Sequence, residues 1–225
     1  MKRPFVFINV AASADGKISD ESRRQVRISC KADLKRVDML RATSDAVMVG
    51  IGTVLSDNPK LTVKAGDLMA LRMKRGKNRQ PLRVVVDSRC RVPPDAEVLS
   101  GEAETLIAVS HAADEEKVKL VAEKENVEVV RFGKERVDLP ALVEYLKVKK
   151  GVDRLMVEGG ATLNHAMLRE GLVDEISIYY GSMIIGGKLS PTIVDGESFE
   201  TPLKLELVEC RQLGEGVLTR WRVIY

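Results

Sequence analysis

Short apolar runs alternate with stretches of helical periodicity over most of the chain. A run of about four to eight apolar residues is typical of a strand buried on both faces, whereas apolar residues three or four positions apart are typical of a helix. The runs predict strands at Phe5–Ala12, Ala46–Val49, Arg83–Asp87, Thr105–Val109, Glu128–Arg131, Arg154–Glu158 and Glu175–Tyr180. The helical stretches predict helices at Ala32–Ala42, Asp114–Glu125 (with Asp114 as its cap), Leu139–Lys149 and Ala161–Glu170.

The pattern changes near the end of the chain, where Leu205–Gln212 and Val217–Ile224 flank the turn sequence Leu-Gly-Glu-Gly, which predicts a hairpin. Strands joined by helices and closed by a hairpin indicate an α/β protein. Its central sheet is expected to be mostly parallel and flanked by helices, with an antiparallel C-terminal hairpin. No Pro-rich or Ser-rich linker divides the 225 residues, so we expect a single domain over residues 1–225.

Two predicted strands end at glycines that precede a helix start. Gly159 and Gly160 separate the strand at Arg154–Glu158 from the helix at Ala161–Glu170. Glycine lets backbone N–H groups approach a ligand closely, and a helix N-terminus favours negative charge, so this corner suits a phosphate or pyrophosphate. A plain tight turn is the alternative.

The second corner is Gly50-Ile51-Gly52-Thr53, where Thr53 is the expected N-cap of a short helix that Pro59 ends. Two anion-binding corners suit a dinucleotide with its phosphate bridge. The glycine spacing is not the G-x-G-x-x-G of a Rossmann domain, so that fold is not indicated.

Composition excludes several classes of function. With 44% hydrophobic and 31% charged residues the chain is globular, and a net charge of +3 is too small to indicate nucleic-acid binding. There is no signal-peptide pattern, and no apolar run approaches the ~18 residues of a membrane span, so we expect a cytoplasmic protein without membrane contact. The basic cluster Arg72–Arg83 is interpreted as a solvated loop face.

Metal chemistry is not indicated. Cys30, Cys90 and Cys210 are far apart, without a C-x-x-C pair, and the only histidines are His111 and His165. We therefore expect no metal site, and the zinc deaminase signature is absent.

Five segments, taken together in order, point to a known family. "MVGIGTVLSDNP", "RVVVDSRCRVP" and "LMVEGGATLN" resemble the cofactor-binding segments of the dihydrofolate reductase superfamily. Their order and spacing are most similar to the archaeal and fungal-type reductases of riboflavin biosynthesis and to the reductase half of the bacterial deaminase–reductase. "NVAASADGKIS" and "EGLVDEISIYYGSMIIGGK" fit the same family. The resemblance implies a dihydrofolate reductase-like fold and NADPH as cofactor. The implied substrate is 2,5-diamino-6-ribosylamino-4(3H)-pyrimidinone 5′-phosphate, whose ribosyl group is reduced to ribityl.

The resemblance also implies roles for individual residues. The cofactor-binding positions are Thr53, Asp57, Val86, Asp87, Ser88, Arg89, Gly159, Gly160, Ala161 and Thr162. The substrate-binding positions are Asn9, Arg41, Asp57, Leu61, Lys64 and Glu158. Bacterial members commonly have lysine in place of Asn9 and arginine in place of Lys64. Asp57 and Glu158 are the candidate catalytic residues, since either carboxyl group could supply a proton as the ribose ring opens to an imine.

The end of the strand at Arg83–Asp87 bears on the choice of cofactor. An acid there, such as Asp87, usually selects a ribose 2′-hydroxyl and hence NAD. Ser88, Arg89 and Arg91 follow at once, and a hydroxyl with guanidinium groups suits the 2′-phosphate of NADPH better. A turn with solvated arginines is the alternative.

Two other functions stay open. One is a dihydrofolate or pterin reductase, against which stands the position of the only tryptophan, Trp221, in the last strand. The other is a non-catalytic nucleotide-binding module, which the presence of both Asp57 and Glu158 disfavours.

Family resemblance and the long apolar run "ISIYYGSMII" (Ile176–Ile185) favour a homodimer. Ser13–Lys17 is expected to be a mobile loop over the active site or a simple Asp-Gly turn.

Overall fold

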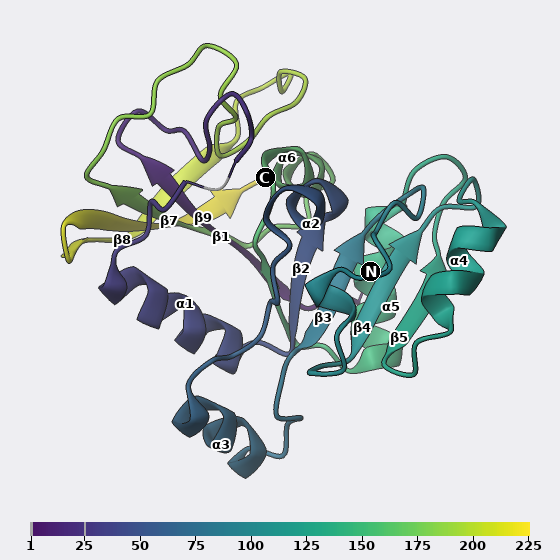
Figure 1. Cartoon of the computed structure of the whole chain (residues 1–225). Helices are drawn as coiled ribbons and strands as arrows, with labels where there is room; N and C mark the ends of the chain where they lie inside the picture. The colour runs from purple at the N-terminus through teal and green to yellow at the C-terminus, as the bar shows by residue number, and fades with distance from the viewer. Residues whose placement is uncertain (1, 25) are drawn as a thin grey trace. The chain divides into compact units, whose positions relative to one another are not determined.

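The computed structural model describes residues 2–24 and 26–225, and these form an α/β protein with a mostly parallel arrangement of strands and an antiparallel C-terminal hairpin, as predicted (Figure 1). The chain divides into two compact units. The first unit runs up to Phe5 and includes Asp38–Met156, and the second unit combines Val6–Val37 with Val157–Tyr225. Helix α1 (Lys31–Thr43) crosses from the second unit to the first at Val37.

The first unit is built on parallel strands in the order β5-β4-β3-β2-β6. They are β2 (Ala46–Gly50), β3 (Leu82–Val86), β4 (Thr105–Val109), β5 (Val127–Arg131) and β6 (Arg154–Val157). Every residue of β4 and the first four of β2 are buried, which is the burial expected of parallel strands covered on both faces. The apolar runs of the sequence therefore become the core of this unit.

Local signals set the ends of the covering helices. Asp114 accepts hydrogen bonds from the Glu116 and Lys117 amides and so caps α4 (Glu115–Ala122), as predicted. Helix α5 (Leu139–Lys150) begins after Asp138, which accepts from the Ala141 amide, and ends at Gly151 with φ of +66°. It lies across one face of the strands and buries Leu142, Val143 and Leu146, together with Leu139 (Figure 1). The remaining helical segments of the unit are α2 (Ile51–Asp57), α3 (Gly66–Lys74) and the short η1 (Glu97–Leu99).

The second unit contains β1 (Phe5–Ser13), β7 (Glu175–Gly181), β9 (Gly216–Ile224) and β8 (Lys204–Leu213), in that spatial order, with helix α6 (Ala161–Arg169). β1 and β7 are parallel, and β7–β9 and β8–β9 are antiparallel. β8 and β9 form the predicted hairpin, in which Leu213 pairs with Gly216 and Gly214 has a φ of +61°.

The apolar run Ile176–Ile185 is longer than the strand that it forms. Its first part is β7, which pairs with β1 on one side and β9 on the other and ends at Gly181. Both edges of β7 are thus paired within the chain, and a role of the remaining residues 182–185 towards a partner subunit stays a prediction.

The prediction for the basic cluster Arg72–Arg83 was wrong at two of its residues. Arg72 lies in α3 and is 2% exposed, and Arg83 lies in β3 and is 0% exposed. Arg72 donates to the carbonyls of Ala42 and Ser44, and Arg83 makes five hydrogen bonds, mostly to carbonyls of the 97–103 segment. A guanidinium can be buried when its donors are satisfied in this way, so the prediction of a solvated loop face was wrong for these two residues.

Neither membrane-spanning nor metal-binding features are found in residues 2–24 and 26–225. No helix there is both long and apolar enough to cross a bilayer. No group of three or more His, Cys, Asp or Glu side chains in the same residues is placed to hold a metal ion.

Candidate active site

The predicted site residues fall in both units. The first unit carries Arg41, Thr53, Asp57, Leu61, Lys64, Val86, Asp87, Ser88 and Arg89, and the second carries Asn9, Glu158, Gly159, Gly160, Ala161 and Thr162. In the first unit β2 and β3 are parallel with Gly50 opposite Val86, so both strands end at the same edge. The turn into α2 and the Asp87–Arg89 segment therefore lie side by side, at the carboxyl edge where ligands of parallel sheets bind.

Helix α2 begins earlier than predicted. Its N-cap is Gly50, not Thr53, because Gly50 is extended (φ −81°, ψ 156°) and the helical turn starts at Ile51. Thr53 lies half-buried in the first turn. No side chain caps this helix, and no acidic residue stands in its first turn. Its first amide groups are thus left for a ligand or water.

Asp57 is the last residue of α2 and is half-buried. Asn58 follows in the left-handed region (φ +42°), which ends the helix before Pro59. Within the described part of the chain the Asp57 carboxylate has neither a hydrogen bond nor an ion pair, so the fold makes no visible use of it. A carboxylate at a helix C-terminus is also unfavourable towards the helix dipole. Both facts favour a functional role.

The segment after α2 passes close to Arg41 in the last turn of α1. The Arg41 Nη1 group donates to the Thr62 carbonyl over 3.1 Å. The Lys64 amide donates to Asp38 Oδ1 over 2.7 Å, which holds this segment to α1 and leaves the Lys64 side chain exposed. Leu61 is 1% exposed with a φ of +55°, so its role in the unit is packing. The structure thus brings the two predicted phosphate-binding cations to the same segment.

At the end of β3 the acidic side chain turns inward. Asp87 is 0% exposed, and its Oδ2 atom accepts from the Val92 amide over 2.8 Å. Its Oδ1 atom is buried without a hydrogen-bond partner among the described residues, and burial raises the pKa of this carboxyl group. Asp87 therefore shapes the turn, and contact with a ribose would require its side chain to leave this position.

Ser88 and Arg89, which follow Asp87, differ in how much of each side chain is exposed to solvent. Ser88 lies between β3 and two other segments, since its carbonyl accepts from Ser110 Oγ and its Oγ accepts from the Val137 amide. The Arg89 side chain is 54% exposed and pairs with the more exposed Glu135 at 2.7 Å. Arg91 is exposed to a similar extent, at 55%, with its Nε 4.0 Å from Asp87 Oδ1, so Arg89 and Arg91 are the cations near this strand end.

In the second unit the double glycine leads directly into α6. Gly159 has a φ of +89°, which favours glycine, and the Gly159–Gly160 peptide bond is cis. Gly160 is the N-cap of α6 and, having no side chain, offers no cap hydrogen bond; the first turn holds no acidic residue. No side chain of the described residues therefore caps the first amides of α6, and such an uncapped helix start is favourable for an anion.

Two polar residues near these corners were missed from the sequence. Asn164 on α6 is 0% exposed; its Nδ2 donates to the Ile193 carbonyl, and its Oδ1 is buried without a partner among the described residues. Arg36 on α1 donates from Nη2 to Oδ1 of Asn9 over 2.7 Å. Asn164 could have been noticed in the sequence, because a polar residue interrupts the apolar period of a helix at this position. No comparable sequence signal marks Arg36. Glu158, at the end of β6, is half-buried.

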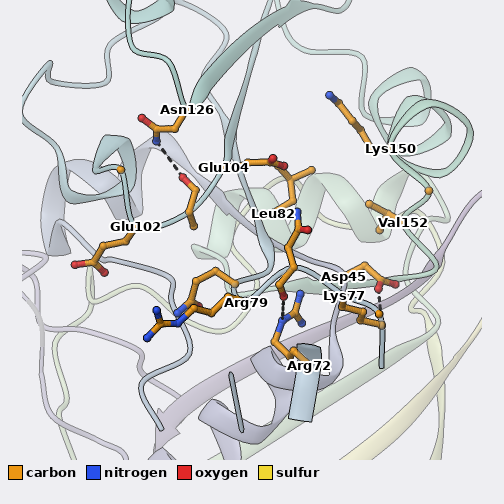
Figure 2. Close-up of a pocket in the computed structure, with 16 residues that line it drawn as sticks. Asp45, Arg72, Lys77, Arg79, Leu82, Glu102, Glu104, Asn126, Lys150 and Val152 are labelled. Atoms are coloured by element: carbon orange, nitrogen blue, oxygen red, sulfur yellow. Dashed lines mark hydrogen bonds and ion pairs between the residues drawn. The ribbon is translucent and has the colours of Figure 1, made fainter. Parts of the chain in front are cut away.

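A cavity of about 530 Å³ also lies in the first unit. Its lining includes Asp45, Glu104 and Asn126, which precede β2, β4 and β5, and Leu82, the first residue of β3, so it stands at the amino edge of the strands (Figure 2). Figure 2 shows Lys77 beside Asp45, an ion pair within the lining. None of the predicted site residues lines this cavity, and its lining carries both cationic and anionic side chains. The carboxyl edge remains the candidate site.

Comparison with known proteins gives a consistent result. The family model described as RibD C-terminal domain matches residues 4–219. The chain is 61% identical over 214 residues to a 2,5-diamino-6-ribosylamino-4(3H)-pyrimidinone 5′-phosphate reductase of Archaeoglobus fulgidus, which covers 95% of each chain. It is 44% identical over 224 residues to the protein of the same name from Methanothermobacter thermautotrophicus, with 98% of this chain and 99% of the relative covered.

Solved structures agree in fold. Acinetobacter baumannii RibD superposes with a TM-score of 0.79 at 26% identity, over 99% of this chain and 59% of that chain. A pyrimidine reductase-like protein from Corynebacterium diphtheriae superposes with a TM-score of 0.85 at 20% identity, over 99% of this chain and 92% of that chain. These likenesses confirm the fold that the sequence resemblance implied.

Proposed function

The chain belongs to the RibD C-terminal domain family, and from this membership we propose that it is an NADPH-dependent reductase of riboflavin biosynthesis. It reduces the ribosyl group of 2,5-diamino-6-ribosylamino-4(3H)-pyrimidinone 5′-phosphate to ribityl. The observation that carries this conclusion is the 61% identity, over 95% of both chains, to an archaeal reductase of that name. The Asp57 carboxylate and the glycine starts of helices α2 and α6 support this proposal.

Each of the two helix starts, taken by itself, suits an anionic group of the cofactor. Helices α2 and α6 both follow glycines, lack a side-chain cap and carry no acid in the first turn. Gly159, Gly160, Ala161 and Thr162 would hold phosphate oxygens through backbone amides, and Thr53 and Val86 would line the pocket. When bound, NADPH supplies a hydride, and the protein supplies position and a proton.

The preference for NADPH over NADH rests on Ser88 and Arg89. The Arg89–Glu135 pair is exposed, and exposed pairs contribute little, so a ribose 2′-phosphate can replace the glutamate as partner. Asp87 supports this site by holding the turn through the Val92 amide.

The substrate is held by charge and hydrogen bonding. Arg41 and Lys64 bind the 5′-phosphate, since the structure brings both to the same segment of the first unit. Asn9 donates to the substrate, and Leu61 supports the phosphate-binding segment. Either Asp57 or Glu158 supplies the proton that the substrate nitrogen gains as the opened ribose is reduced. Asp57 is the first choice because the fold leaves its carboxylate unused.

The whole chain acts as one reductase domain, which the family match from residue 4 to residue 219, across both units, supports. We place it in the cytoplasm, where phosphorylated intermediates and reduced nicotinamide are available. A homodimer is the proposed assembly, on the resemblance to the family and on the exposed leucines of β8, Leu205 and Leu207.

The decisive experiment mixes purified protein, NADPH and the ribosylaminopyrimidinone phosphate, and follows the loss of reduced-nicotinamide absorbance. We expect turnover, together with a ribityl product that carries deuterium when the cofactor is labelled at its transferable position. Dihydrofolate is the matched second substrate. Turnover with dihydrofolate alone would indicate a pterin reductase, and cofactor binding without turnover of either would indicate a nucleotide-binding module.

A further inference from the structure

A buried polar network in the second unit surrounds the Asn9 side chain. The Arg36 guanidinium donates from Nη2 to Asn9 Oδ1 over 2.7 Å and from Nη1 to Ser177 Oγ over 3.0 Å. Its Nε group donates to Asp33 Oδ1 over 2.8 Å. Ser29 donates to the other oxygen of Asp33 over 2.6 Å. One arginine thus connects α1 with the two neighbouring strands β1 and β7.

The residues of the network are largely buried. Asp33 is 1% exposed, Ser177 5%, Asn9 7%, and the Arg36 side chain 14%. Asn9 and Ser177 are paired residues in the parallel register of β1 and β7, so the strands fix the separation of the two acceptors. The planar guanidinium holds three groups at once in a fork geometry, which a lysine ammonium cannot reproduce.

This arrangement decides which way the Asn9 amide faces. A guanidinium has only donors, so the atom of Asn9 that meets it must be the carbonyl oxygen. The Nδ2 group is turned away from Arg36 and donates to no other group in residues 2–24 and 26–225. The Nδ2 atom is not among the buried side-chain atoms that lack a partner, so this NH₂ group reaches solvent while the other end of the amide is held inside the network. An accessible donor on a fixed amide can donate to a ligand.

We propose that Arg36 is a positioning residue that holds the Asn9 amide with its NH₂ group towards the substrate, where it donates to an oxygen acceptor. The inference rests on the proposed function, in which Asn9 binds substrate. Arg36 itself remains inside the network and does not touch the substrate. Without Arg36 the amide can rotate by 180° and present its oxygen, which cannot bond to an acceptor.

Asn9→Asp is the sharpest test because it is nearly isosteric. The new carboxylate can pair with Arg36, so the fold is expected to keep its melting temperature or gain slightly. The NH₂ donor is lost, and a second acceptor faces the substrate oxygen. We expect KM for the substrate to rise about tenfold to a hundredfold, with kcat and the NADPH dissociation constant nearly unchanged.

Arg36→Lys tests the positioning role through a double-mutant cycle with Asn9→Ala. It keeps a cation beside Asp33 but loses the fork. We expect Arg36→Lys to raise KM several-fold in the parent and to leave KM unchanged in the Asn9→Ala background, because the two residues act through the same contact. Ser177→Ala is the matched control, since it removes one Arg36 contact without touching Asn9, and its KM should equal that of the parent.

The outcomes distinguish failure of the proposed function from failure of the positioning role of Arg36. If the parent protein does not reduce the substrate, the proposed function is wrong. If the parent turns over while Asn9→Asp keeps the parent KM, or if the Arg36 and Asn9 effects simply multiply, the positioning role is wrong and the network only ties α1 to the strands.

Discussion

Most charged side chains near the candidate site already have partners, and these partners separate structural from functional roles. Asp87 is buried and holds a turn, Arg89 is paired with Glu135, and Arg36 is bound into a network. Asp57 differs, because its carboxylate has neither a hydrogen bond nor an ion pair within residues 2–24 and 26–225 and stands at the C-terminal end of a helix, where a negative charge is unfavourable. A residue whose charge destabilises the fold, with no compensating contact, is a candidate for catalysis.

Asp57→Asn keeps the shape of the side chain and removes its charge. We expect kcat to fall by a factor of about a hundred to ten thousand, the range for loss of a general acid or base. The melting temperature should stay the same or rise slightly, and NADPH should still bind. Steady-state kinetics and thermal unfolding provide the check, with Asp95→Asn, an exposed aspartate outside any element, as control. Parent-like turnover would make Asp57 a turn residue and Glu158 the leading proton donor.

Arg89→Gln addresses the cofactor. Loss of a charge-assisted contact to the 2′-phosphate costs about 1.5–3 kcal/mol, so the dissociation constant of NADPH should rise roughly tenfold to a hundredfold. That of NADH should not change. Titration of both cofactors measures this, and Arg211→Gln, which removes another exposed arginine paired with a glutamate, is the control. Equal affinity of the parent protein for NADPH and NADH would contradict the assignment.

The helices of this protein begin in two distinct ways. Helices α4 and α5 have aspartate caps, Asp114 and Asp138, whose side chains accept hydrogen bonds from first-turn amides. Helices α2 and α6 begin at glycines with no side-chain cap. An uncapped start loses roughly 0.5–2 kcal/mol relative to a capped one, and this loss is offset when an anion binds there. Helix α3 also begins without a side-chain cap, at Ala65, but it carries Asp67 in its first turn. A glycine start with no cap and no acid in the first turn is therefore what supports the proposal that α2 and α6 bind a ligand.

The turn at Ser13–Lys17 is connected by hydrogen bonds to the segment at Ile185 and Gly186. Asp15 accepts from the amides of Ile185 and Gly186 and from Ser13 Oγ, and these hydrogen bonds lower its pKa from 3.8 to about 2. Because the folded-state pKa is depressed, the contacts contribute fully above pH ~4 and are lost as pH falls through about 2.

We therefore expect the amide resonances of Ile185 and Gly186 to titrate with a midpoint near 2 in the parent. Asp15→Asn should abolish this titration while the rest of the spectrum is retained. Two-dimensional NMR between pH ~5 and the acid limit of the folded protein measures it. A midpoint near the ordinary value of 3.8 would mean that the 185–186 segment is not held by Asp15.

Strand β3 depends on the buried Arg83. Its five hydrogen bonds join β3 to the 97–105 segment, and burial lowers its pKa to about 10. Lysine has three donors on one atom, so Arg83→Lys leaves buried carbonyls unsatisfied and should lower the free energy of unfolding by on the order of 3 kcal/mol. Urea unfolding measures this. Arg222→Lys, at an exposed pair with Glu206, should stay within about 0.5 kcal/mol of the parent.

At the scale of the whole molecule, the outermost strand of the second unit is β8, and it carries apolar side chains into solvent. Leu205 is 43% exposed and Leu207 52% exposed, and Val208 is also exposed. A long edge strand with exposed leucines is a site for pairing with another chain, and a two-fold pairing of two copies is the commonest solution.

We expect light scattering to give about twice the chain mass of 24.9 kDa at micromolar concentration. Leu207→Lys should shift the protein to the monomer mass, because a charge at this place opposes burial of the strand edge. Lys204→Arg, a conservative change on the same strand, should leave the dimer intact. A parent protein that scatters as a monomer would contradict the assembly.

The sequence by itself determined most of the elements and the two glycine corners, but not helix α3 (Gly66–Lys74), which no prediction included. Strands, helices, caps and turns depend on neighbouring residues, so the period of apolar positions, Asp114 and the Leu213–Gly216 turn could be read directly. The family resemblance then supplied the function, because the motifs occur in order along the chain.

Only the tertiary structure decided which polar side chains are buried and what they hold. Arg72 and Arg83 were predicted to be solvated, yet each is buried against carbonyls that the local pattern does not identify. Strand β7, within the apolar run that begins at Ile176, pairs with β1 and β9, and the run itself identifies neither neighbour. The contact of Arg36 with Asn9 joins residues 27 positions apart. Hydrogen-bond partners come from segments distant in sequence, so burial and pairing follow from the fold and not from any local period.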